Sequence, residues 1–169
     1  NWQEDTGNWR HIMELKEYRY AYDELNVRFE SIERLMGYEP GQAPDPIPEM
    51  IGEALQKAPD YCDIQGGYRL VDTIDLDREA KALVVDHITF QISRVITRQL
   101  KQAEQLAVFV CTAGAGISDW SKKLMHEGDM LFGYVVDVVG SEVVETAMDR
   151  IQDILEEEAA GDGLGITDR

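Results

Sequence analysis

The sequence predicts an α+β fold, on three observations. Apolar residues recur at three- and four-residue steps from Tyr22 to Met36, which indicates an amphipathic helix. Leu106–Thr112 is an unbroken apolar run too short for a stable helix, which indicates a buried strand. A four-residue apolar step then continues from Val135 to Leu155, and only a helix presents that step as one stripe. No regular strand–helix repeat joins these segments, so an α/β fold is not indicated.

Composition limits the class of protein. At 169 residues and 44% hydrophobic content, the chain is long enough to bury one core. Its 33 acidic and 16 basic residues leave a net charge of −17, which disfavours nucleic acids and anionic membrane surfaces as partners. No apolar stretch is long enough to span a bilayer. Two cysteines, Cys62 and Cys111, are too few for a disulfide framework, so we expect a soluble protein in the reduced cytoplasm.

The first third of the chain is expected to be mostly helical. Residues 1–12 are interpreted as an upstream extension before a start at Met13, which is followed by the helix-like charged run Glu14–Glu17. The helix Tyr22–Met36 should stop at Gly37. Asp45-Pro46 makes a cap and first turn for a second helix, which Pro59 interrupts and whose apolar face comprises Ile47, Met50, Ile51, Ala54, Leu55 and Ala58.

The middle of the chain mixes short strands and helices. Gly66-Gly67 indicates a turn before an extended piece, Tyr68–Val71. The β-branched residues between Leu83 and Ile92 indicate a strand. Ser93 should cap a helix that ends near Gln105, directly before the strand Leu106–Thr112.

Two helices are expected after that strand. The first is short and begins at Ser118 or Asp119 and ends at His126. Gly128-Asp129 then opens one long helix, in which Gly140 indicates a close crossing with another element. Glu156–Glu158 place negative charge at its C-terminal end, where the helix dipole disfavours it, so this end should fray or be solvated. Gly161–Arg169 has the composition of a linker.

The junction between the apolar strand and the short helix is the most informative local feature. Glycines at 114 and 116 could admit a ligand to the backbone at a helix N-terminus, although a plain tight turn explains them as well. A dinucleotide fingerprint would require a third glycine where Asp119 stands. Cys111 is interpreted as a packing residue, and the histidines lack metal-ligand spacing, at positions 11, 87 and 126.

Two glutamates interrupt the apolar part of the long helix. Glu142 and Glu145 either contact a ligand or belong to a solvated helix face, and periodicity alone favours the helix face. The sequence contains no recognisable nucleophile–base pair, paired-carboxylate signature or phosphate loop, so the spacing of its residues does not indicate a reaction.

From Phe90 onward the sequence resembles the activation (reactivation) domain of cobalamin-dependent methionine synthase, in particular its short stand-alone relatives. The resemblance rests on Ala107–Gly114, similar to the family's apolar strand ending in a Thr-x-Gly turn, and on Gly128-Asp129-Met130 opening a long helix that continues through Glu142 and Glu145. About half of the chain is covered well, and the order and spacing of these segments carry the match.

The resemblance implies a twisted antiparallel sheet flanked by helices that binds S-adenosylmethionine. It further implies docking over a cobalamin-binding domain, so that cobalamin reduced by a flavodoxin-like electron donor is remethylated. The family's ligand-binding glutamate falls on Glu145, with Glu142 as the alternative, and Thr112 and Gly114 form the turn beside the ligand. Arg169 stands where the family has the arginine of an Arg-x-x-x-Gly-Tyr motif that holds the ligand's carboxylate.

The chain departs from the family at this motif. The sequence stops at Arg169, without the Gly-Tyr that follows in the family, so a single domain that lacks its C-terminal portion is expected. Two other interpretations stay open: a structural or protein-interaction module whose glycine turn is only a turn, and a nucleotide-binding enzyme that uses Gly114 and Gly116.

Overall fold

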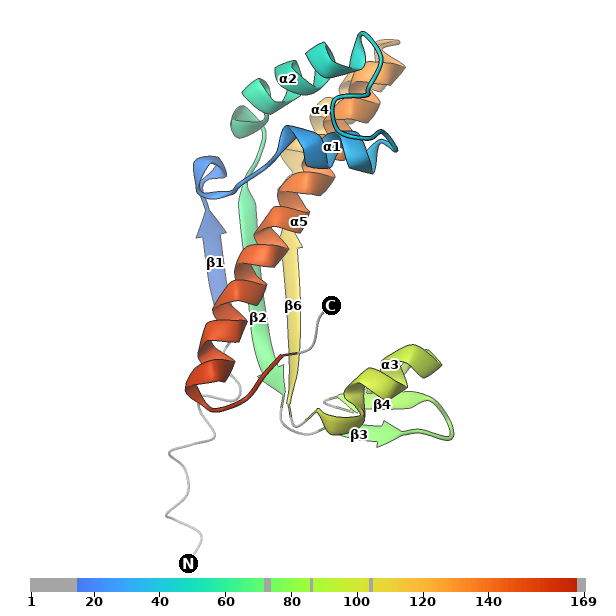
Figure 1. The fold of residues 1–169 in the computed structure, drawn as a ribbon, viewed down its shortest axis with the longest axis vertical. Helices are drawn as coiled ribbons and strands as arrows, with labels where there is room; N and C mark the ends of the chain where they lie inside the picture. Colours follow the sequence, from blue (N-terminus) through green and yellow to red (C-terminus); the bar gives the residue numbers. More distant parts are fainter. Residues whose placement is uncertain (1–14, 72–73, 86, 104, 167–169) are drawn as a thin grey trace, which may run out of the picture.

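The computed structural model describes residues 15–71, 74–85, 87–103 and 105–166. Within these ranges the chain forms two three-stranded antiparallel sheets and several helices, which confirms the predicted α+β class. Figure 1 shows an elongated molecule: α1, α2 and α4 gather at one end, the larger sheet runs along the middle, and the smaller sheet projects sideways at the other end.

The larger sheet, sheet A, has the strand order β1-β2-β6, from Lys16–Tyr20, Ile64–Val71 and Leu106–Thr112. Residues that pair across the antiparallel strands share a face, so the pairing of Tyr68 with Phe109 and of Gly66 with Cys111 defines one face of the sheet. Tyr68 is buried on that face against Ile151 of the last helix. Sheet A therefore owes its buried layer to that helix.

The smaller sheet, sheet B, has the order β3-β4-β5, from Ile74–Asp77, Ala82–Val85 and Ile88–Gln91. Helix α3, Arg94–Gln99, follows it and continues into the short 3-10 turn Leu100–Gln102. Ser93 caps α3 as predicted, because its hydroxyl accepts a hydrogen bond from the Ile96 amide at 3.3 Å. The predicted strand between Leu83 and Ile92 is in fact a pair of strands, with Val85 opposite Ile88.

The remaining helices surround the main core. They are α1 (Phe29–Leu35), α2 (Ile47–Lys57), α4 (Ala115–His126) and α5 (Met130–Gly161), with 3-10 turns at Tyr22–Glu24 and Ala58–Asp60. The predicted apolar face of α2 is correct at Ile47, Ile51 and Ala54, all of which are buried. Among the described residues, no helix combines the length and apolarity needed to cross a bilayer.

Helix α5 is the long helix that the sequence predicts. Asp129 caps it by accepting a hydrogen bond from the Phe132 amide at 3.1 Å. Its N-terminal half crosses α4 closely, since Ser121 donates to the Gly133 carbonyl at 2.8 Å and a Cβ on Gly140 would lie 3.3 Å from Ile117. The close crossing predicted at Gly140 is therefore confirmed.

The turn predicted at Gly66-Gly67 is wrong, because both glycines lie inside β2. They are there for close packing. A Cβ on Gly67 would come 2.6 Å from the Lys16 carbonyl oxygen, and one on Gly66 would come 2.7 Å from the Ile151 side chain. Glycine inside a strand marks close approach by another part of the chain as often as it marks a turn.

The predicted helix Tyr22–Met36 is wrong in its first half. The chain is extended at Leu25 and again at Arg28, and only Phe29–Leu35 is α-helical. Leu25 is buried in the main core, so its tertiary contacts decide the backbone here rather than helix propensity. The helix-like interpretation of Glu14–Glu17 is also wrong from Lys16 onward, where β1 begins and pairs with β2.

One helix start differs from expectation, and one helix end agrees with it. Helix α4 begins at Ala115, three residues before Ser118. Helix α5 continues to Gly161 with Glu156 and Glu157 exposed, so of the two expected outcomes, fraying or solvation, the structure shows solvation. Glu158 is held in place, because the Lys16 ammonium lies 2.7 Å from both of its carboxylate oxygens and the Tyr68 hydroxyl donates to it. These hydrogen bonds outweigh burial, which acts in the opposite direction, and lower the Glu158 pKa. The interpreted start at Met13 and the residue Arg169 lie outside the described residues.

Gly67 and Gly52 provide a matched test of this packing. We expect Gly67→Ala to lower the free energy of unfolding by about 1–3 kcal/mol, because its Cβ would displace backbone of β1. We expect Gly52→Ala, on the exposed side of α2 with nothing within 4 Å of the new Cβ, to raise it by about 0.5–1 kcal/mol. Urea unfolding measures both, and equal effects from the two substitutions would contradict this packing.

Candidate functional site

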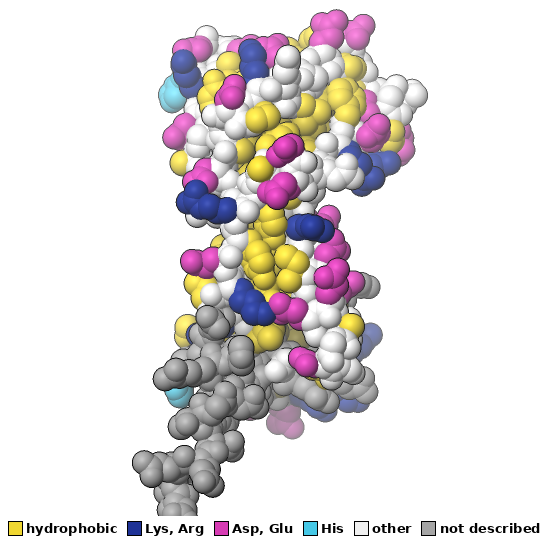
Figure 2. All heavy atoms as spheres, turned by 90° about the vertical axis from the view of Figure 1, so that its left-hand side faces the viewer, with side chains coloured by type: hydrophobic (Ala, Val, Ile, Leu, Met, Phe, Trp, Pro, Cys, Tyr) yellow, Lys and Arg dark blue, Asp and Glu magenta, His cyan; other side chains and the backbone are white. Residues whose placement is uncertain are grey.

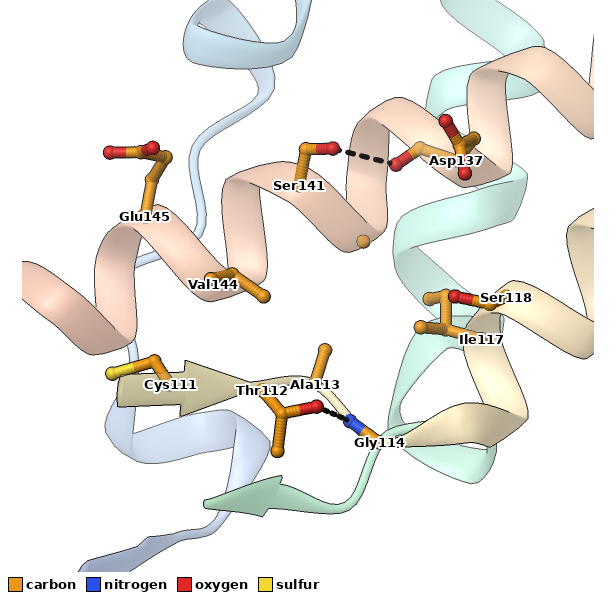
Figure 3. A pocket seen from close by; sticks show the side chains of 11 residues that line it. Cys111, Thr112, Ala113, Gly114, Ile117, Ser118, Asp137, Ser141, Val144 and Glu145 are labelled. Atoms are coloured by element: carbon orange, nitrogen blue, oxygen red, sulfur yellow. Dashed lines mark hydrogen bonds between the residues drawn. The ribbon is translucent and has the colours of Figure 1, made fainter. Parts of the chain in front are cut away.

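A hollow of about 360 Å³ opens where the C-terminal end of β6 and the start of α4 face α5. Figure 3 shows its two walls: the turn of Thr112, Ala113 and Gly114 on one side and α5 on the other, with Val144 directed toward the turn and the Glu145 side chain directed away from it, at the edge of the hollow. The complete lining is Cys111, Thr112, Ala113, Gly114, Ile117, Ser118, Asp137, Gly140, Ser141, Val144 and Glu145. Its volume lies in the range of small-molecule sites.

The first wall is a structured turn. The Gly114 amide donates a hydrogen bond to Thr112 Oγ1 at 3.0 Å, which ties the end of β6 to the start of α4. Gly114 has a φ of +83°, and a Cβ there would meet the Asp63 backbone at 3.0 Å, so both conformation and space require glycine. Gly114 is the N-cap of α4, and no side chain of the described residues caps that helix. The free amides of the first turn give this wall partial positive charge.

The second wall carries the charged side chains. Asp137, Ser141 and Glu145 follow one another at four-residue steps, so they lie along one side of α5. Ser141 Oγ donates a hydrogen bond to the main-chain carbonyl of Asp137 at 3.2 Å, as Figure 3 shows. This hydrogen bond does not involve the Asp137 carboxylate. The hollow thus has carboxylates on its α5 wall and a helix N-terminus on its α4 wall. That arrangement suits a ligand with a cationic and an anionic group.

The structure brings three of the five predicted site residues together. Thr112, Gly114 and Glu145 line the same hollow. Glu142 does not line it; it is buried on the side of α5 that faces α1. Arg169 lies outside the described residues.

Sequence reasoning missed Asp137, Ser141 and Ser118 as lining residues. The signal for the first two was present, because both precede Glu145 at the step that places residues on one helix side. Ser118 was assigned to the start of α4, but it lies in the first turn of that helix and faces the hollow.

Gly116, unlike Gly114, serves packing. A Cβ on Gly116 would lie 2.5 Å from the Tyr61 carbonyl oxygen, and Tyr61 stacks on Trp120 of the same helix with ring centroids 4.4 Å apart. Gly116 does not line the hollow. The pair of glycines is therefore not a joint phosphate cradle.

The two cysteines serve packing or are protonated, and the described residues do not form a cluster that could hold a metal ion. Cys111 lines the hollow and packs against the main core and against the cluster of Tyr68 and Ile151, in accord with its interpretation as a packing residue. Burial raises the pKa of the Cys62 thiol to about 11, so it is protonated at neutral pH and is a weak nucleophile. Within the described ranges, no cluster of three His, Cys, Asp or Glu residues is arranged to hold a metal ion.

Protein-family models give no match to this sequence, and no curated protein matches it. The site is consequently argued from its own geometry.

Glu142 provides a test of its own burial, away from the hollow. Burial raises the pKa of its carboxyl group, although a hydrogen bond from Ser31 and the nearby Arg28 partly oppose this. An acid with a raised pKa in the folded state stabilises the fold most below its ordinary pKa of 4.5, and loses that advantage as pH rises through the folded-state value.

We therefore expect Glu142→Gln to be more stable relative to wild type at pH 7 than at pH 4, as measured by urea unfolding at both pH values. The same relative stability at both pH values would contradict the burial of the Glu142 carboxyl group.

Proposed function

We propose that this chain is an S-adenosylmethionine-binding accessory domain, with the fold of the methionine synthase activation domain, that supports reductive reactivation of cobalamin-dependent methionine synthase. One observation carries the proposal. Thr112, Gly114 and Glu145 are the positions that the resemblance assigns to the ligand. Glu145 is more than 30 positions after the other two along the chain, and all three line one hollow.

The chemistry of the hollow supports this ligand. S-Adenosylmethionine carries a sulfonium and an ammonium group, which suit the carboxylates of Asp137 and Glu145. Its hydroxyls and carboxylate suit amide donors such as those of the first turn of α4. Hydrogen bonds to charged groups are the stronger class, so these contacts would fix the orientation of the ligand.

The role that follows is binding and positioning. In this function a partner domain or protein holds cobalamin, which accepts the methyl group once a flavodoxin-like donor has reduced it. The residues of this chain hold the methyl donor: Glu145 and Asp137 orient the cationic part, and the turn at Thr112 and Gly114 limits how deeply the ligand enters. Arg169 would add a bidentate contact to the carboxylate.

Calorimetric titration tests the proposal. The titration uses the protein as its gene encodes it, including any residues after Arg169. We expect S-adenosylmethionine to bind this protein. Glu145→Gln should weaken binding by about 1.5–3 kcal/mol, the loss typical of a hydrogen bond to a charged group, and Asp137→Asn should act in the same direction.

Glu157→Gln is the matched control, because it removes an exposed carboxylate from the same helix outside the hollow. It should leave the affinity unchanged. S-Adenosylhomocysteine, which lacks the sulfonium charge, should bind more weakly to wild type and lose less on Glu145→Gln. Absence of measurable binding to the wild-type protein would contradict the proposal, as would equal losses for Glu145→Gln and Glu157→Gln.

A further inference from the structure

Sheet B and α3 form a projection, here called the arm, comprising residues 74–85 and 87–102. Figure 1 shows α3, β3 and β4 at lower right, at the opposite end of sheet A from α1, α2 and α4. The strands of the arm make their principal contacts with one another. A separate small core holds it together, with Val71, Leu83 and Val85 buried and Leu76, Ile92, Leu100 and Leu106 packed against them.

One face of the arm is apolar and uncovered. Ile88 and Phe90 pair with Val85 and Leu83, so all four side chains are on the face of sheet B that Ile92 and Leu100 cover. That cover ends before the edge strand β5. Ile88 (60%) and Phe90 (47%) on β5 are therefore exposed, and on α3 Val95 (65%) and Ile96 (41%) are exposed as well. Exposed apolar side chains gathered within nine residues are typical of an interaction surface rather than of scattered surface residues.

The same segment is basic in an acidic protein. Residues 88–103 contain Arg94, Arg98 and Lys101 and no Asp or Glu, whereas the whole chain has a net charge of −17. All three cations are on exposed residues of α3 or the turn after it. Figure 2 shows the rest of the molecule, here called the body, from the side of β1, where Asp and Glu side chains are spread over the surface. A basic rim beside exposed apolar groups resembles the composition of protein interfaces, where arginine and aromatic residues are enriched.

We propose that the face formed by β5 and α3 is a docking surface for a protein partner whose contact region is acidic with apolar residues at its centre. Charge complementarity selects this partner: carboxylates would meet Arg94, Arg98 and Lys101 while apolar groups cover Phe90 and Val95. The inference does not depend on the identity of the small molecule in the hollow.

Other occupants fit less well. Two copies of this chain that paired through the same face would place three cations of each copy opposite three of the other. An anionic membrane extends beyond the arm and would meet the acidic body, and three cations are fewer than the roughly 4–8 that mark binding to anionic lipids. A partner with a limited contact region avoids both penalties.

The test uses the full chain and a defined probe, a helical peptide with leucines on one face and glutamates at its other positions. Fluorescence anisotropy should show binding that weakens as salt rises. The triple variant Arg94→Glu, Arg98→Glu, Lys101→Glu should bind the peptide at least about tenfold more weakly. The matched control, Arg34→Glu, Lys122→Glu, Lys123→Glu, makes the same change in net charge at exposed residues outside the arm and should bind as wild type does.

A second variant separates the apolar contribution from charge. Phe90→Ser, Val95→Ser should weaken peptide binding several-fold and lower the urea midpoint only slightly, because Phe90 (47%) and Val95 (65%) are largely exposed. Hydrogen exchange should show peptide-dependent protection within residues 88–102.

Four results would overturn the proposal: no peptide binding by wild type, equal losses in the two triple variants, protection confined to the body, or a dimer in sedimentation that Phe90→Ser, Val95→Ser dissociates. Arm-dependent binding to phosphatidylserine vesicles without peptide binding would show that the occupant is a membrane.

Discussion

The burial of one continuous side of α5 is the interaction on which the rest of the structure depends. At 32 residues the helix is about 48 Å long, enough to follow the molecule from the α1, α2 and α4 end to the far end of sheet A. Val135, Val139 and Val143 pack into the main core, and Ile151 packs on Tyr68 of sheet A. Neither the three helices nor the sheet would have a complete core without it, so α5 sets their relative positions and also supplies one wall of the hollow.

Sequence reasoning succeeded where one local pattern dominated. The strand at Leu106–Thr112, the cap at Ser93 and the apolar step of α5 each have one explanation that outweighs the rest. The predicted burial of that strand is wrong, because one face of sheet A has no covering layer and Val108 (48%) and Val110 (69%) are exposed. It failed where a distant part of the chain decides the backbone. Gly67 is a strand residue because β1 passes too close for a Cβ, and Leu25 is extended because the main core needs its side chain. The residues next to Gly67 and Leu25 in the sequence carry no pattern that predicts these contacts.

The candidate site shows the same division. Glu142 and Glu145 are one turn apart and differ by only about 60° around the helix, yet one faces α1 and the other the hollow. Which of them meets a ligand depends on where α1 and α4 pack on α5, and that is a tertiary property. The turn at Thr112 and Gly114 could be predicted because it is local. The four-residue step places Asp137 and Ser141 on the same side of α5 as Glu145, but the contact of that side with α4 is tertiary and could not be predicted from the sequence.

The close crossing of α4 and α5 has a consequence for selectivity. A Cβ on Gly133 would lie 2.9 Å from the Ser121 carbonyl oxygen, and Ile117 rests against Gly140, so backbone contact fixes the separation of the two helices. The hollow therefore has its dimensions before a ligand arrives, and a molecule that fits it loses little entropy of the protein on binding. The distance between α4 and α5 therefore excludes a bulkier molecule. A larger residue at either glycine would change this distance, and so which molecules fit, without altering any polar group that contacts them.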